Sequence, residues 1–132
     1  MKTKWIGYFL RFSISIAFLS AVLDRFGVWP KEISAWGNWE SFVSYTGILS
    51  PWAPESVVPI LAGIATAAEV VLAILLLVGY KLDLAAKASG ILLLLFGLSM
   101  VFTVGIKAPL DYSVFTAAAA AFAISALSSK ND

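Results

Sequence analysis

The sequence has no cysteine and no histidine, and each absence removes whole classes of chemistry. Without cysteine the chain cannot form disulfides, thiolate zinc sites or Cys-ligated iron–sulfur clusters. Without histidine it cannot ligate haem through imidazole or use a Ser–His or Cys–His catalytic pair. We therefore expect no resident metal, haem or iron–sulfur cofactor.

Charged residues are also scarce, at 13% of the 132 residues, against about 25% in soluble domains. Apolar residues make up 61%. A soluble domain of this size has a large surface to cover with polar groups, so these proportions exclude a soluble monomer. The net charge is only +1 and the cations are spread along the chain, so nucleic acid is not expected as a partner.

Four apolar segments are long enough for helices that cross a bilayer, which takes about 20 residues each. They cover residues 5–23, 58–79, 85–104 and 112–127. The runs are continuous, without the alternation typical of barrel strands, which favours helices. The predicted fold is an all-α integral membrane protein, a single domain over residues 1–132 built as a four-transmembrane-helix bundle in the lipid bilayer.

The distribution of Lys and Arg predicts an orientation, because cytoplasmic connections carry an excess of these residues. Six of the nine cations fall on the side of the two termini: Lys2, Lys4, Arg11, Lys81, Lys87 and Lys130. We therefore predict a multi-pass protein with both termini in the cytoplasm. Arg11 splits the first apolar stretch and no A-x-A site follows before Asp24, which argues against a cleaved signal peptide.

The outer loop, residues 24–57, is rich in aromatic residues. Its candidate lid or interface aromatics are Trp36, Trp39, Tyr45 and Trp52. Asn38 is a plausible N-cap, and the pattern after it predicts a short helix in the outer interface or folded over the bundle. Two interpretations stay open. The rings form a belt that fixes membrane depth, or they form a lid over a pocket between the helices.

Glu69 is the strongest functional candidate, because a charge inside a span costs about 2.5–3.5 kcal/mol on insertion scales. It lies near the middle of the segment 58–79. Its neighbours on the same helical face are small or hydroxylated: Ala62, Ala65, Thr66 and Ala73. Such a face favours close helix packing, so Glu69 and Thr66 are expected to face the bundle, in a ligand-binding site or a buried ion pair.

Arg11 is the natural partner for Glu69, in a charge-assisted pair. The alternative is that Arg11 snorkels to the inner headgroups. A pair would serve a ligand or would only lock two helices together. Lys87, one turn into its span, is expected to snorkel or to join the Glu69 group.

A second polar cluster is predicted at the outer end, formed by Asp24, Arg25, Lys107 and Asp111. Asp111 precedes the last span and is a good N-cap candidate. The functional alternative for the cluster is a polar mouth that receives a small ligand under the tryptophan-rich loop.

The order and spacing of these features resemble the DoxX family of small bacterial membrane proteins. The resemblance rests on Arg11 in YFLRFSISIAFL and Glu69 in ATAAEVVLAILLLVGY, with the connection LLLVGYKLDLAAKASGILLLLFG and the last-span start KAPLDYSVFTAAAAAFAIS. Many family members have a Gly and a Lys near the end of the first span, where this chain reads AVLDRFG with Arg25. The resemblance implies a four-helix bundle in the bacterial cytoplasmic (inner) membrane. It also implies a loose association with redox metabolism, since the related DoxD group resembles the membrane subunit of a thiosulfate:quinone oxidoreductase.

Three functional hypotheses follow, and none includes an assigned catalytic residue. The leading one is a redox-accessory or quinone-linked protein that binds a small lipophilic ligand, with a quinone as the candidate cofactor. The second is a proton-coupled transporter of small solutes, acting as a homodimer, based on the carboxyl of Glu69. The third is a structural anchor for a soluble oxidoreductase partner.

Overall fold

The computed structural model describes residues 2–131, with side chains described for residues 3–128. Helices account for 77% of the chain, and no strand occurs among the described residues. The helices are α1 (Lys2–Arg25), α2 (Trp39–Leu49), α3 (Val58–Val78), α4 (Leu82–Thr103), α5 (Lys107–Asp111) and α6 (Val114–Asn131). The predicted all-α class is therefore confirmed. The side chains of Lys2 and Lys130, which entered the orientation prediction, lie outside the described residues.

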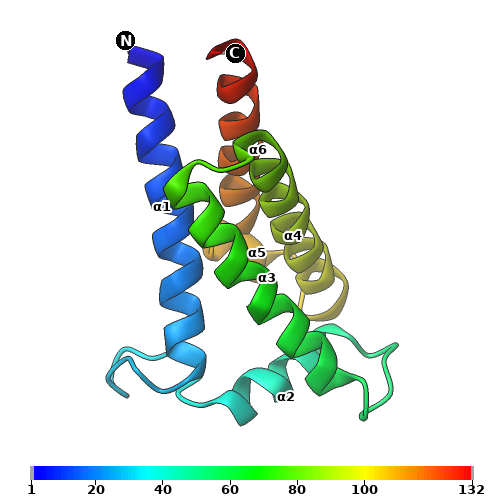
Figure 1. Cartoon of the computed structure of the whole chain (residues 1–132). Coiled ribbons are helices and arrows are strands. Elements are labelled where there is room, and N and C mark those ends of the chain that lie inside the picture. The colour runs from blue at the N-terminus through cyan, green and yellow to red at the C-terminus, as the bar shows by residue number, and fades with distance from the viewer. Residues whose placement is uncertain (1, 132) are drawn as a thin grey trace.

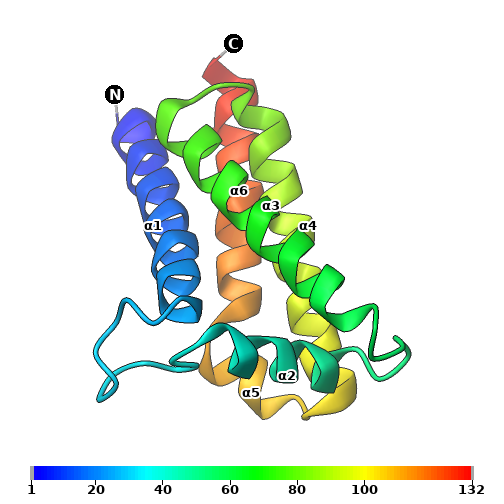
Figure 2. The same ribbon diagram turned by 60° about the horizontal axis from the view of Figure 1, so that its bottom comes forward.

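The long helices pack in a cyclic order. Helix α1 contacts α3 and α6, and α4 contacts the same two helices from the other side. Figure 1 shows that both chain ends lie at the same end of the molecule as the α3–α4 turn. Figure 2 shows α2 across the opposite end, where it contacts α1, α3 and α4, while α5 connects α4 to α6. We call these the terminal end and the α2 end.

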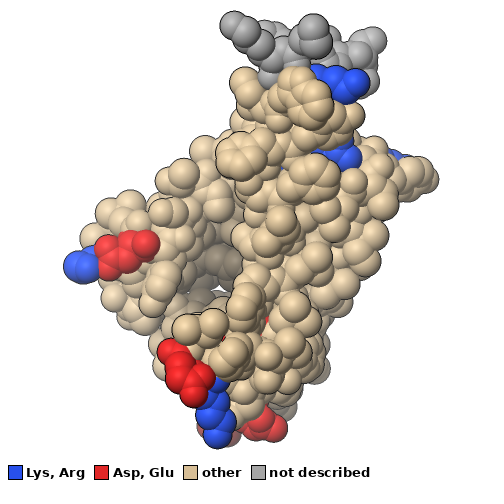
Figure 3. Space-filling view, turned by 90° about the vertical axis from the view of Figure 1, so that its left-hand side faces the viewer, with Lys and Arg blue, Asp and Glu red and all other residues tan. Residues whose placement is uncertain are grey.

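Three helices are long and apolar enough to cross a membrane. They are Thr3–Arg25, Val58–Val78 and Leu82–Thr103, and the apolar part of α6, Val114–Ser128, is shorter. Large apolar side chains point outward from the bundle, with Phe9 72% and Phe102 83% exposed. Figure 3 shows one face on which charged side chains are sparse and lie mainly near the edges. Exposed apolar surface on this scale indicates a membrane protein.

The predicted spans match the first three of these helices to within three residues at each end. The last part of the chain differs, because residues 107–111 form the separate helix α5. Pro109 fits the first turn of α5, where its missing N–H needs no acceptor. Asp111 therefore ends α5 and is not the N-cap of α6, which corrects the prediction. Ser113, with a φ of 56°, lies between the two helices.

Helices α4 and α6 approach closely where glycines of α4 face phenylalanines of α6. A Cβ added to Gly90 would lie 2.6 Å from the ring of Phe122, and one added to Gly97 would lie 2.8 Å from the ring of Phe115. Small residues allow helices to pack closely where no water drives their association.

Arg11 of α1 holds the C-terminal end of α3. Its Nε donates to the carbonyl of Leu76 at 2.8 Å, and its Nη2 donates to the carbonyl of Leu77 at 3.2 Å. The last carbonyls of a helix lack partners within the helix and carry partial negative charge, so a cation there is favourable. Gly79 closes α3 in the left-handed conformation, with a φ of 78°.

Gly79→Ala should destabilise the fold by about 1–3 kcal/mol, because a left-handed conformation is strained for alanine. The added Cβ would also lie 2.7 Å from Nη2 of Arg11. Gly63→Ala, in the same helix, is the control, since its Cβ meets nothing within 4 Å. That change should be neutral or stabilising. Unfolding by SDS in mixed micelles, followed by circular dichroism, measures both. Equal stability of the two variants would contradict the role assigned to Gly79.

Candidate functional site

Polar side chains of α1 set the register between α1 and α3. Ser15 donates to the carbonyl of Ala73 at 3.0 Å, while Arg11 donates one turn further toward the end of α3. The two helices therefore run antiparallel. Following the same register toward the α2 end places Arg25, the last residue of α1, beside the stretch of α3 that carries Thr66 and Glu69.

Arg25 and Glu69 form a buried ion pair in this register. Nη1 of Arg25 lies 2.6 Å from Oε2 of Glu69, and Nη2 donates to Oε1 at 3.1 Å. Nη1 also donates to the hydroxyl of Thr66 at 2.8 Å. Arg25 and Glu69 are each only 2% exposed. Two parallel contacts between a guanidinium and a carboxylate are strong and fix the orientation of both groups.

Two aromatic rings cover the guanidinium of Arg25. Its Cζ lies 3.7 Å from the ring centre of Phe42 and 5.3 Å from that of Trp36. The two rings meet edge to face, with centres 5.2 Å apart. Phe42 belongs to α2, whose N-cap is Asn38, as predicted: the amide of Ser41 donates to its side chain at 2.8 Å. Cation–π contacts that are shielded from water stabilise the buried cation further.

Asp24 places Trp36 over the ion pair. Its carboxylate accepts from the amides of Ala35, at 2.7 Å, and Trp36, at 3.4 Å, and from the hydroxyl of Ser34. The segment before α2 is thereby tied to the last turn of α1. Adjacent residues thus have separate roles: Asp24 anchors the loop, and Arg25 enters the bundle.

One donor of the site is left without a partner. The Nε of Arg25 is buried, and no acceptor for it occurs among the described residues. The Oε2 of Glu69 contacts Nη1 of Arg25 but accepts no hydrogen bond of good geometry. Buried polar groups are nearly always paired, so an orphaned N–H in a native structure calls for an explanation. The hydroxyl of Thr66 accepts from Arg25, and its proton remains available for donation.

The predicted pairing of Arg11 with Glu69 is wrong. Arg11 contacts α3 two helical turns beyond Glu69, and Arg25 takes the place beside the carboxylate. The guanidinium of Arg11 lies at the C-terminal end of α3, where it donates to the last carbonyls of that helix. Lys87 does not join the Glu69 group. It pairs with Asp83 at 3.1 Å on the exposed face of α4.

The four residues of the predicted outer cluster do not come together. Lys107 and Asp111 form an exposed pair within α5, at 2.5 Å. Asp24 and Arg25 are buried at the end of α1 and contact other groups. A polar mouth made of these four residues is therefore not present among the described contacts. The described residues also contain no group of three or more potential metal ligands of the His, Cys, Asp or Glu type.

Of the predicted lid aromatics, only Trp36 contacts Arg25. Trp39 stacks on Phe26, with ring centres 5.4 Å apart, and Tyr45 packs against Trp36, with ring centres 6.4 Å apart. Trp52 is 74% exposed. The residue that sequence reasoning missed as a site residue is Phe42. Its spacing of three residues from Trp39 in the predicted short helix is the signal that places both rings on one face.

Comparisons with known proteins add no relatives to this picture. No protein-family model matches the chain, and neither curated proteins nor solved structures give a match. The resemblance to the DoxX family therefore stays a prediction, and the interpretation of the site rests on its own geometry.

Arg25→Gln and Glu69→Gln should each destabilise the protein by about 3–5 kcal/mol, because each leaves an uncompensated buried charge. The double variant should be more stable than the sum of the single effects predicts, since it leaves no charge behind. The matched control is the exposed pair, with Lys107→Gln and Asp111→Asn, whose coupling should be close to zero. Unfolding free energies in mixed micelles give both cycles. Equal coupling in the two pairs would contradict a buried ion pair.

Proposed function

We propose that this chain is a DoxX-like integral membrane protein that binds a small lipophilic molecule, such as a quinone, at the site formed by Arg25, Glu69 and Thr66. The observation that carries the proposal is the buried ion pair with an orphaned donor, inside an apolar bundle and under two aromatic rings. Charged groups inside membrane helices are rare and usually functional.

The path of the chain supports a fourth crossing by α6. Three span-length helices, traversed in turn from the terminal end, bring the chain to the α2 end, yet the C-terminus lies beside the N-terminus (Figure 1). Helix α6 returns along α4 over this distance. With both termini in the cytoplasm of the bacterial inner membrane, the aromatic segment and α2 face the outer interface, where Trp and Tyr are favoured.

The charges of the site favour a neutral ligand with polar ends. The guanidinium and the carboxylate neutralise each other, so an anion or a cation gains little there. A carbonyl oxygen of the ligand could accept a hydrogen bond from Nε of Arg25, and the hydroxyl of Thr66 could donate to a second ligand oxygen. The rings of Phe42 and Trp36 offer flat faces on which another ring stacks. Quinones combine these features in one lipophilic molecule.

Access to the site requires movement of the segment that covers it. The side chains of Arg25 and Glu69 are only 3% exposed, so a ligand displaces Phe42, Trp36 or both. Helix α2 and the loop before it are then the lid of the site. Figure 3, which looks onto the side where α1 lies, shows a deep hollow with largely uncharged walls.

In this proposal the chain does not hold a redox centre of its own. Electrons come from the bound molecule or from a soluble oxidoreductase partner, and Glu69 exchanges protons with the ligand when Arg25 turns away. The burial of the ion pair also favours a second candidate function, in which the chain is a structural subunit that anchors such a partner. In that case the pair only locks α1 to α3, and no ligand is bound.

Protein purified gently from its native membrane should carry about one quinone-like molecule per chain, the stoichiometry of a single specific binding site. Solvent extraction followed by mass spectrometry identifies it. Thr66→Val keeps the side-chain shape and the ion pair but removes the hydroxyl, so retention should fall about five-fold, as for one lost hydrogen bond. Glu69→Gln should abolish retention.

Glu40→Gln is the control, because Glu40 is an exposed carboxyl of α2 outside the site. Its extract should equal that of the wild type. Ordinary phospholipid alone in the wild type and in every variant would refute ligand binding and favour the anchor. A soluble protein that copurifies with all four forms would support the anchor directly.

A further inference from the structure

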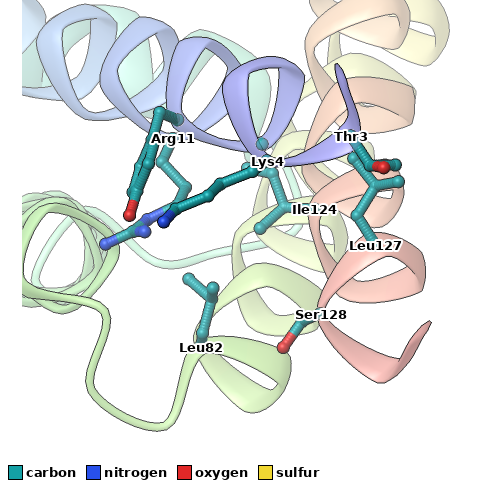
Figure 4. A pocket seen from close by; sticks show the side chains of 9 residues that line it. Thr3, Lys4, Arg11, Leu82, Ile124, Leu127 and Ser128 are labelled. Atoms are coloured by element: carbon teal, nitrogen blue, oxygen red, sulfur yellow. The ribbon is translucent and has the colours of Figure 1, made fainter. Parts of the chain in front are cut away.

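A second site is present at the terminal end, on the opposite side of the molecule from α2. A pocket of about 440 Å³ opens there between α1, α4 and α6, within the range of about 300–1,000 Å³ typical of ligand pockets. Its lining residues are Thr3, Lys4, Gly7, Tyr8, Arg11, Leu82, Ile124, Leu127 and Ser128. Figure 4 shows Lys4 and Arg11 on one wall, with Leu82, Leu127 and Ser128 across from them.

The pocket carries a net positive charge, because no acidic side chain lines it. Two of its lining residues are cations and none is acidic. Both cations lie over the same ring: Nζ of Lys4 is 6.0 Å from the ring centre of Tyr8, and Cζ of Arg11 is 5.3 Å from it. Two like charges held near one another favour a bound anion, which lowers their repulsion.

The cations also have donors to spare. A guanidinium has five N–H groups, and Arg11 uses two of them on the carbonyls of α3. Its remaining N–H groups, and the ammonium of Lys4, donate to no acceptor within the described part of the chain. The hydroxyls of Thr3 and Ser128 line the same space. This donor set fits the several acceptor oxygens of a phosphate group.

The surroundings of the pocket are apolar. Leu82, Ile124 and Leu127 line its other walls. On the outer face of α1, the neighbouring Trp5, Ile6 and Phe9 are 68%, 53% and 72% exposed. A molecule with a phosphate in the pocket could therefore lay hydrocarbon chains along α1. Basic pockets between membrane helices on the cytoplasmic side bind the head groups of anionic lipids.

We infer that this pocket binds a phosphate-bearing anion, supplied by an anionic phospholipid or as free phosphate, through Lys4 and Arg11. The site is separate from the proposed quinone site, because Arg11 and Arg25 lie about 20 Å apart along α1. A failed test of one proposal therefore leaves the other unaffected. A lipid bound here would contact α1, α4 and α6 together and would tie the terminal end of the bundle to one leaflet.

The test uses the full chain in detergent micelles and native mass spectrometry, with phosphatidylglycerol and phosphatidylcholine of identical acyl chains. The wild type should retain one phosphatidylglycerol in preference to phosphatidylcholine. Lys4→Gln should weaken that retention about five-fold, as expected for one basic residue near a lipid surface. Lys4 is exposed, so its loss leaves the core intact. Arg11→Gln would also remove the cap of α3 and is the less clean variant.

Lys81→Gln is the matched control, since Lys81 is an exposed cation near the same end that does not line the pocket. It should retain phosphatidylglycerol like the wild type. A parallel arm compares sodium phosphate with sodium chloride at equal ionic strength, followed by thermal unfolding. Stabilisation by phosphate that Lys4→Gln removes, without a lipid preference, would assign the site to free phosphate.

Three results would overturn the inference. The first is equal retention of the two lipids together with no specific effect of phosphate. The second is an equal loss of lipid in Lys4→Gln and Lys81→Gln, which would indicate general surface charge. The third is unchanged binding in Lys4→Gln and in the charge-reversed Lys4→Glu.

Discussion

The antiparallel contact between α1 and α3 is the constraint on which the rest of the structure depends. Three side chains of α1 donate hydrogen bonds to α3. Arg11 donates near the C-terminal end of α3, Ser15 one turn before that end, and Arg25 near the middle of the helix. In apolar surroundings an unpaired polar group costs several kcal/mol, so these donors tolerate no other register. Together with the buried Phe18 and Val22 they recur every three or four residues along one face of α1, the spacing of a helix–helix seam. Polar contacts along this seam specify how the apolar helices pair, which apolar packing alone leaves ambiguous.

The arrangement at the α2 end follows from the last turn of that seam. Because Arg25 turns inward to Glu69, Asp24 points to the loop and accepts from the amides of Ala35 and Trp36. The loop then places Trp36 over the guanidinium, and α2 adds Phe42, whose ring contacts both the guanidinium and Trp36. The ion pair, the loop and α2 are therefore mechanically linked. Displacing Trp36 and Phe42 would expose the ion pair, and separating the pair would remove the cation that the two aromatic rings contact.

Much of this fold could be predicted from the sequence, and the errors have two causes. Apolar runs located α1, α3 and α4, because that signal is local. The buried position of Glu69 followed from Thr66 and the alanines on its face. Its partner did not, since periodicity shows which face of a helix is buried but not how far one helix slides along another. Arg11 and Arg25 lie on the same face, and only the register distinguishes them. Asp111 was misplaced for a local reason, the short helix that begins before Pro109.

The two arginines at the ends of one seam differ in what neutralises them, and this difference separates the two proposed sites. Arg25 faces a full negative charge on Glu69, so its site is neutral and suits a dipolar, uncharged molecule. Arg11 faces helix carbonyls, which together carry only about half a negative charge. Lys4 adds a second cation beside it, so the terminal pocket keeps a net positive charge. The two cations repel each other, and an anion bound between them would lower that repulsion. In the two proposals, the same residue type thus serves a neutral ligand at one end of α1 and an anion at the other.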